Sequence, residues 1–302
     1  MSSPAVELEA VVKAFANVTA VNGISASVPR GCVFGVLGPN GAGKTTTIRM
    51  VVGILRPDSG SVRVLGETEP GAIKRRLGYL PEEKGLYKKM RLLELVTYFG
   101  RLKGMGRADA RAAGRRLLDQ FGLAQWQDQK CESLSKGMGQ KVQIVGTLIH
   151  SPELIVLDEP FSGLDPVNVE LVRQIILEQK AANRTVILST HVMEQAEQIC
   201  DAIVLINRGR TLVEGPTAQV RQQTQRTVIL DYDGDGAALS GLPGVLRVND
   251  AGRHAELSLA DDADPQQLLL ALAAKLTIRR FDTRAASLHE VFVRSVRADD
   301  AL

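Results

Sequence analysis

The stretch Gly38-Pro39-Asn40-Gly41-Ala42-Gly43-Lys44-Thr45 fits the phosphate-binding pattern G-x-x-x-x-G-K-[ST] in full. The apolar run 32–37 before it predicts a buried parallel strand, and apolar residues at helical spacing predict a helix over 46–55. Glycines let backbone N–H groups surround phosphate oxygens, and a helix N-terminus adds partial positive charge. We expect Lys44 to reach the β- and γ-phosphates and the Thr45 hydroxyl to bind Mg²⁺. A chance glycine-rich turn is the alternative, and the flanking elements argue against it.

A second apolar run, residues 154–157, ends in two acidic residues, Asp158 and Glu159. Such a run is typical of a central parallel strand covered on both faces, and open α/β sheets bind ligands at the C-terminal ends of their strands. We expect Asp158 on the Mg²⁺ side and Glu159 as the general base that polarises the attacking water. Two solvated acids are the alternative, against which Pro160 and the loop that follows it argue.

Two further segments place polar groups at the ends of predicted elements. Ser135 precedes apolar residues at helical spacing and is a candidate N-cap, while Gly137 allows close backbone approach. This helix start is therefore a second candidate anion site. His191 follows the apolar run 185–189, so its imidazole belongs at another strand end, within reach of a γ-phosphate.

From about residue 6 to about residue 220, the order and spacing of these motifs resemble the ATP-binding cassette (ABC) ATPases. The resemblance identifies the following segments: Walker A at 38–45, the signature motif at 134–138, Walker B at 154–159, the D-loop at 162–165 and the switch histidine at His191. It implies that ATP is bound by an aromatic residue that stacks on adenine, by the Walker A loop and by the signature motif: Phe15, Gly38, Pro39, Asn40, Gly41, Ala42, Gly43, Lys44, Thr45, Thr46, Ser135 and Gly137. It implies Glu159 and His191 in catalysis.

Two motifs depart from the family pattern, at three positions. The signature motif has Lys136 and Met138 where the family has glycine and glutamine, although Ser135 and Gly137 are retained. Glu82 stands where the family has the Q-loop glutamine, so it lacks the amide donors but still offers oxygen to Mg²⁺. We expect Glu82 to join Thr45 and Asp158 as a metal ligand; the alternative is that it points to solvent. Similar Pro-Glu-Glu sequences occur in a branch that resembles sodium- and drug-exporter ATPases.

Composition agrees with a globular intracellular protein of 302 residues and net charge +3, too small a charge to indicate nucleic-acid binding. Its three cysteines show no metal or disulfide spacing, which favours buried reduced thiols. We expect no signal peptide and no transmembrane helix, because no stretch approaches about 18 consecutive apolar residues. A pore must then come from another polypeptide.

The predicted fold is α/β: a P-loop NTPase of the ABC type with antiparallel β and helical subdomains, plus a small C-terminal α+β domain. We expect the ATPase domain over 1–222, its helical subdomain over about 82–140, and the accessory domain over 223–302. The basic and apolar segment 84–91 has two interpretations. It is either a solvated loop with its apolar side chains turned inward or part of a groove for a short helix of a membrane subunit.

These observations predict an ATP-hydrolysing subunit of an ABC transporter that powers transport, export being favoured, by ATP-driven dimerisation. Its expected partners are a separate transmembrane permease subunit and a second nucleotide-binding chain, identical or paired, with no nucleic acid. Its expected location is cytoplasmic, on the inner face of the membrane. A soluble ABC-type mechanical ATPase is the alternative, although such proteins usually carry two cassettes or long insertions. A non-enzymatic sensor is disfavoured because the catalytic set is present.

Overall fold

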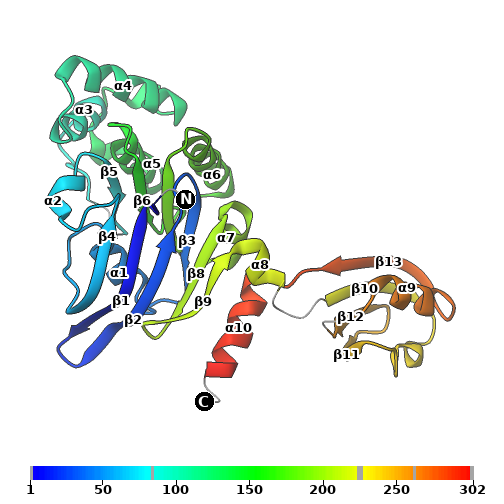
Figure 1. Cartoon of the computed structure of the whole chain (residues 1–302). Helices are drawn as coiled ribbons and strands as arrows, with labels where there is room; N and C mark the ends of the chain where they lie inside the picture. The colour runs from blue at the N-terminus through cyan, green and yellow to red at the C-terminus, as the bar shows by residue number, and fades with distance from the viewer. Residues whose placement is uncertain (1–2, 83–84, 223–226, 261–262, 300–302) are drawn as a thin grey trace. The chain divides into compact units, whose positions relative to one another are not determined.

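The computed structural model describes residues 3–82, 85–222, 227–260 and 263–299 (Figure 1). The chain forms two compact units, Met1–Gly215 and Pro216–Leu302. The sequence placed the division at 222/223, beside residues 223–226, which lie outside the described residues. The two units are described separately.

A six-stranded sheet forms the centre of the first unit, in the order β5-β6-β7-β3-β8-β9. Its strands are β3 (Val33–Leu37), β5 (Leu77–Leu80), β6 (Leu154–Asp158), β7 (Thr185–Thr190), β8 (Ala202–Asn207) and β9 (Arg210–Pro216). Strand β3 pairs in parallel with β7 and β8, and β6 pairs in parallel with β5 and β7. All residues of β3, β6 and β7 are buried, as the unbroken apolar runs predict.

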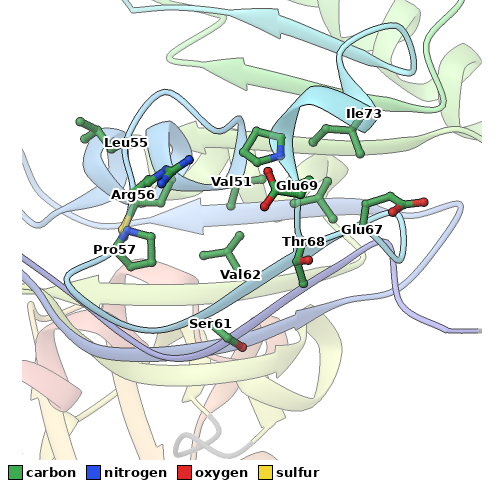
Figure 2. Close-up of a pocket in the computed structure, with 13 residues that line it drawn as sticks. Val51, Leu55, Arg56, Pro57, Ser61, Val62, Glu67, Thr68, Glu69 and Ile73 are labelled. Carbon is green, nitrogen blue, oxygen red and sulfur yellow. The ribbon is translucent and has the colours of Figure 1, made fainter.

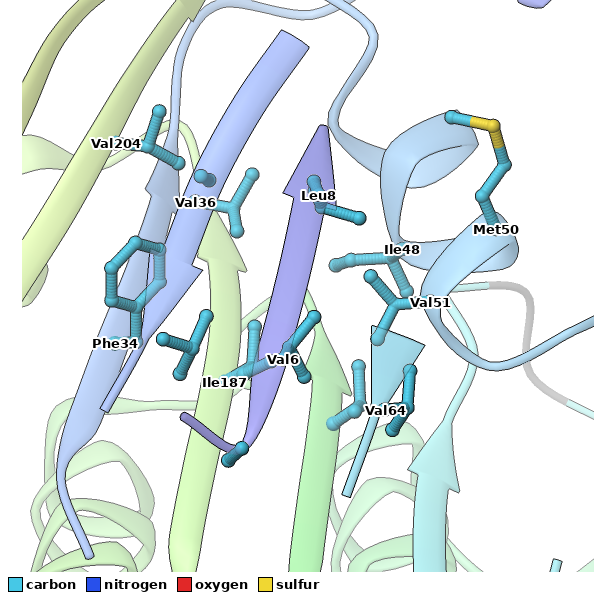
Figure 3. Packing of buried hydrophobic residues seen from close by; sticks show 14 of the residues in the cluster. Val6, Leu8, Phe34, Val36, Ile48, Met50, Val51, Val64, Ile187 and Val204 are labelled. Carbon is cyan, nitrogen blue, oxygen red and sulfur yellow. The ribbon is translucent and has the colours of Figure 1, made fainter. Parts of the chain in front are cut away.

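An antiparallel sheet packs against this parallel sheet. It contains β1 (Val6–Phe15), β2 (Val18–Val28) and β4 (Ser59–Val64), in the order β2-β1-β4. Figure 3 shows the apolar core that joins the layers, in which Val6 and Leu8 of β1 lie between Phe34 and Val36 of β3 and Ile48 of α1. This core fixes the strand before the phosphate loop and the helix after it.

The helix after the phosphate loop, α1 (Lys44–Val51), is shorter than the predicted 46–55. Gly53 adopts a positive φ of 73°, and the N–H groups of Ile54 and Leu55 both donate to the carbonyl of Arg49. A left-handed glycine just beyond the last turn is a common helix stop. The prediction was wrong at this end because Ile54 and Leu55 continued the apolar spacing past that glycine.

Helices cover the parallel sheet, and the two between residues 92 and 120 lie within the range of about 82–140 predicted for the helical subdomain. The helices are α2 (Pro70–Ile73), α3 (Leu92–Leu102), α4 (Arg107–Gln120), α5 (Lys136–Leu148), α6 (Pro166–Ala181) and α7 (Met193–Ile199). Helices α3 and α4 lie side by side, and the glycines at 104 and 106 break the chain between them (Figure 1). Cys32, Cys131 and Cys200 are buried thiols.

The second unit has the predicted α+β composition. Its antiparallel sheet has the order β11-β12-β10-β13, formed by β10 (Thr227–Asp233), β11 (Val245–Asp250), β12 (His254–Leu259) and β13 (Thr277–Arg284). Its helices are α8 (Thr217–Gln222), α9 (Pro265–Ala273) and α10 (Leu288–Asp299). Leu268 and Leu272 of α9 pack on Val228, Leu230 and Leu257 of the sheet.

Two leucines of α9 provide a matched test of this second core. Leu272 is fully buried, whereas Leu270 is 72% exposed. Leu272→Ala should lower the free energy of unfolding by about 2–5 kcal/mol, because it removes buried methyl groups and leaves a cavity. Leu270→Ala should change it by no more than about 0.5 kcal/mol. Hydrogen exchange of the β10 and β12 amides measures both effects: we expect at least about tenfold faster exchange for Leu272→Ala alone. Equal exchange in the two variants would contradict this packing.

Candidate functional site

The phosphate loop joins the C-terminal end of β3 to the start of α1. At two of its positions glycine is required, because φ is positive there and because a Cβ would collide with neighbouring backbone. A Cβ on Gly38 (φ 155°) would lie 2.2 Å from the carbonyl oxygen of Ile206. A Cβ on Gly43 (φ 105°) would lie 2.5 Å from the carbonyl oxygen of Ala20. Only glycine permits these backbone approaches, so the loop is held in one conformation by β8 and β2.

Lys44 is buried under this loop, with 6% of its side chain exposed. Its Nζ donates to the carbonyl oxygens of Gly38 at 2.8 Å and Pro39 at 3.1 Å. The same Nζ lies 3.6 Å from Glu159 Oε1, and the Glu159 side chain is 10% exposed. The ammonium group is therefore held between the loop and the end of β6, where it balances one carboxylate charge.

Asp158 ends β6 and is oriented by the neighbouring strand. The parallel register pairs Asp158 with Ser189 of β7, and the Ser189 hydroxyl donates to Asp158 Oδ1. Asp158 is 1% exposed, and within the described part of the chain its Oδ2 has no hydrogen-bond partner. Burial is the main cause that raises the pKa of Asp158, and the charges of Glu82 and Glu159 raise it further. Such a carboxylate is suited to a cation that replaces its lost hydration.

Glu159 has a left-handed backbone, with φ 50°. Its N–H donates to Ser189 Oγ at 3.0 Å, and its Oε1 lies 2.9 Å from Nδ1 of His191, which directly follows β7. The His191 side chain is half-exposed. Sequence reasoning missed Ser189, which touches both residues at the end of β6. The available signal was a hydroxyl inside an apolar strand run, two residues before His191.

Glu82 lies on the same side of the phosphate loop. Its Oε2 is 3.2 Å from Thr45 Oγ1, and the same Thr45 oxygen is 3.3 Å from Asp158 Oδ1. A hollow of about 310 Å³ opens here, lined by the loop together with Ala20, Thr46, Glu82 and Glu159. Lys84, a candidate counter-charge for Glu82, lies outside the described residues.

Two predicted site residues, Ser135 and Phe15, are not among the residues that line this hollow. Ser135 caps α5, since its Oγ accepts from the N–H of Met138 at 3.2 Å, and it is exposed together with Lys136. Phe15 is exposed at the end of β1, with Lys13 Nζ 5.8 Å from its ring centroid. Within one chain the structure thus brings together the Walker A and Walker B residues, Glu82 and His191.

Two other hollows have a different character. Figure 2 shows one of about 310 Å³ between α1, β4 and α2, lined by apolar residues such as Val51, Val62 and Ile73 with Glu67 and Glu69 at its edge. A second, of about 370 Å³, is lined by residues of β5, α3 and α5 and by Gly85. The hollow between α1, β4 and α2 is unsuited to binding phosphate, because its lining is mainly apolar.

The described residues include no helix that is both long and apolar enough to cross a bilayer.

Comparison with known proteins agrees with this geometry. The ABC transporter family model matches residues 21–162, and the model described as ATP-binding protein DrrA1-3-like, C-terminal domain, matches residues 215–296. A solved structure described as the ATP binding subunit of an ABC transporter has a TM-score of 0.67 and 31% identity, over 72% of this chain and 92% of that chain.

Several relatives match along nearly the whole chain. The ABC transporter ATP-binding protein YhaQ of Bacillus subtilis is 36% identical, over 96% of this chain and 98% of that protein. The daunorubicin/doxorubicin resistance ATP-binding protein DrrA of Streptomyces peucetius is 35% identical, over 96% and 91%. The Nod factor export ATP-binding protein I of Ralstonia nicotianae is 36% identical, over 97% and 94%. The resemblance read from the motifs is confirmed: the chain belongs to the ATP-binding proteins of ABC transporters, which hydrolyse ATP to power transport.

Proposed function

We propose that this chain hydrolyses Mg²⁺-bound ATP in a site completed by a second nucleotide-binding chain, and that it drives export through a separate membrane subunit. The observation that carries the proposal is the convergence of Lys44, Thr45, Asp158 and Glu159 at the C-terminal ends of β3 and β6. A cation, a hydroxyl and two carboxylates are the groups that phosphoryl transfer to water requires.

The phosphate loop and Lys44 would bind the β- and γ-phosphates. Lys44 already contacts two loop carbonyls, so it needs only to exchange these contacts for phosphate oxygens. Thr45, Glu82 and Asp158 fit Mg²⁺, because they offer oxygen ligands and Asp158 Oδ2 is buried without a partner among the described groups. Bound Mg²⁺ would neutralise phosphate charge there.

Glu159 and His191 would act on the attacking water. The Glu159 carboxylate lines the hollow beside Lys44 and Thr45, where it can accept a proton from water. His191 Nδ1 lies 2.9 Å from Glu159 Oε1 and holds that carboxylate in place. The backbone of Glu159, from which this side chain projects, is held by the hydrogen bond that its N–H donates to Ser189 Oγ.

The signature motif supports a site shared between two chains. Ser135 and Gly137 lie at the start of α5, where free N–H groups and the helix dipole attract anions. Ser135 is exposed and lies outside the lining of the hollow of its own chain. We therefore place these groups on the γ-phosphate of the partner chain's ATP, with Phe15 on the adenine of its own.

The hollow between β5, α3 and α5 would receive the membrane subunit. Its lining includes the exposed Leu102. Next to the lining residue Phe99 in the chain, the exposed Tyr98 packs edge-on against Tyr87, with ring centroids 5.8 Å apart. Leu86 instead turns toward α5, since a Cβ on Gly139 would lie 3.4 Å from Leu86 Cδ1. The inward turn of Leu86 agrees with the interpretation of segment 84–91 as a loop with its apolar side chains turned inward, and the groove for a membrane subunit remains a proposal. Export is supported by the name of the Nod factor export relative of Ralstonia nicotianae, and the name of the Streptomyces peucetius relative concerns drug resistance.

Glu159→Gln tests the general base. The amide keeps the shape of the side chain but cannot take a proton, so turnover should fall about 10²–10⁴-fold while ATP binding persists. Size-exclusion chromatography should show an ATP-dependent dimer that no longer dissociates. The matched control is Glu170→Gln, an exposed residue of α6, which should hydrolyse ATP like the parent. Near-normal hydrolysis by Glu159→Gln would reject the assignment.

A mixture of two inactive chains tests the shared site. Lys44→Ala should weaken ATP binding, because it removes a cation from the phosphates, and Ser135→Arg should block the partner's site. Each homodimer should be inactive. An equimolar mixture should regain about a quarter of the parent's ATPase rate per chain, since half of the dimers are heterodimers with one intact site of two. No recovery, or an active Ser135→Arg homodimer, would mean that ATP is not bound across an interface.

A further inference from the structure

The contact of Thr45 with two carboxylates contains a conflict. Thr45 Oγ1 lies 3.2 Å from Glu82 Oε2 and 3.3 Å from Asp158 Oδ1. A hydroxyl has one hydrogen and therefore satisfies one of the two acceptors at a time. At any moment, the carboxylate oxygen that receives no hydrogen faces the Thr45 oxygen, and their lone pairs repel each other. Glutamine at position 82 would remove this conflict, because its amide donates hydrogen bonds.

The negative charge at this point is only partly balanced. Glu82, Asp158 and Glu159 are close enough for Glu82 and Glu159 to act electrostatically on Asp158. Among the described residues, Lys44 is a cation that pairs with one member of this group, since its Nζ lies 3.6 Å from Glu159 Oε1. Asp158 Oδ2 is almost fully buried and has no partner within the described part of the chain. One further positive charge beside Thr45, close to Glu82 Oε2 and Asp158 Oδ1, would relieve the repulsion between these two carboxylates.

The spacing of the oxygens fits a small hard cation. Adjacent ligands of an octahedral ion with bonds of about 2.1 Å are about 3.0 Å apart, close to the two separations at Thr45. A hydroxyl and two carboxylates are oxygen donors of the kind that Mg²⁺ and Mn²⁺ prefer. Neither separation needs to change by more than a few tenths of an ångström, and the remaining positions are open to water from the hollow.

We infer that Thr45, Glu82 and Asp158 form a divalent-cation site that fills before the nucleotide arrives, with Glu82 as the residue that makes it independent of ATP. This inference rests on the proposed function of the same site. In a site with glutamine at position 82, the phosphates supply much of the negative charge that holds the ion. Here Glu82 supplies it, so the ion is in place when the phosphates enter and guides them onto the loop.

The test measures cation binding to the full nucleotide-free chain. Mn²⁺ is the probe, and electron paramagnetic resonance follows the loss of the free-ion signal. We expect one Mn²⁺ per chain, displaced by excess Mg²⁺, and at least about tenfold weaker binding for Glu82→Gln, since a charged ligand is lost. The same substitution at the exposed Glu69 is the matched control and should leave the affinity unchanged. Glu82→Gln should still bind ATP with Mg²⁺, which shows that it is folded.

Two results would overturn the inference: no Mn²⁺ bound by the nucleotide-free parent, or equal affinity in the parent and Glu82→Gln. These outcomes are separable from failure of the proposed function. If the parent binds no Mn²⁺ but hydrolyses ATP and loses this activity in Glu159→Gln, only the pre-bound cation is disproved. If Mn²⁺ binds through Glu82 but the parent lacks ATPase activity, the proposed function fails instead.

Discussion

The hydroxyl of Ser189 is the contact on which the arrangement of the site depends. It donates to Asp158 Oδ1 and accepts the N–H of Glu159, so one side chain of β7 positions the last residue of β6 and the residue that follows it. This double contact exists because β6 and β7 are parallel and in a register that pairs Asp158 with Ser189. A one-residue slip would turn the carboxylate to the other face of the sheet, since side chains alternate along a strand. The buried apolar residues of both strands fix the register and thereby the chemistry.

Holding these charges inside the protein costs stability, and the structure limits that cost in identifiable ways. Lys44 and Glu159 are both nearly buried and lie 3.6 Å apart, so neither charge is left without a counter-charge. The left-handed backbone of Glu159 adds strain of about 1–3 kcal/mol, typical of functional sites. The apolar core around β1, β3 and α1 opposes this cost. Asp158 is compensated least, because one of its oxygens lacks a partner among the described groups.

The sequence predicts the parts of this site that are local. The phosphate loop, the acidic pair and the cap at Ser135 are set by neighbours in the chain, and the structure has the expected strand or helix beside each. Ser189 was missed because its importance comes from strand register, which brings together residues 31 positions apart. The end of α1 was missed because apolar spacing was given more weight than Gly53. The closeness of Glu82 to Thr45 was predictable only from the family pattern.

The start of α5 is connected within one chain to the loop that follows Glu159. A Cβ on Gly163 would lie 2.9 Å from Lys136 Cε, so the lysine chain packs over this left-handed glycine. Gln140 Nε2, one turn further along α5, donates to the carbonyl oxygen of Pro160 at 2.9 Å. Displacement of α5 therefore acts on the residue directly after Glu159 through a hydrogen bond as well as through packing. Glycine, the family residue at position 136, has no side chain with which to make the packing contact, so Lys136 adds a contact between the start of α5 and the loop that follows Glu159.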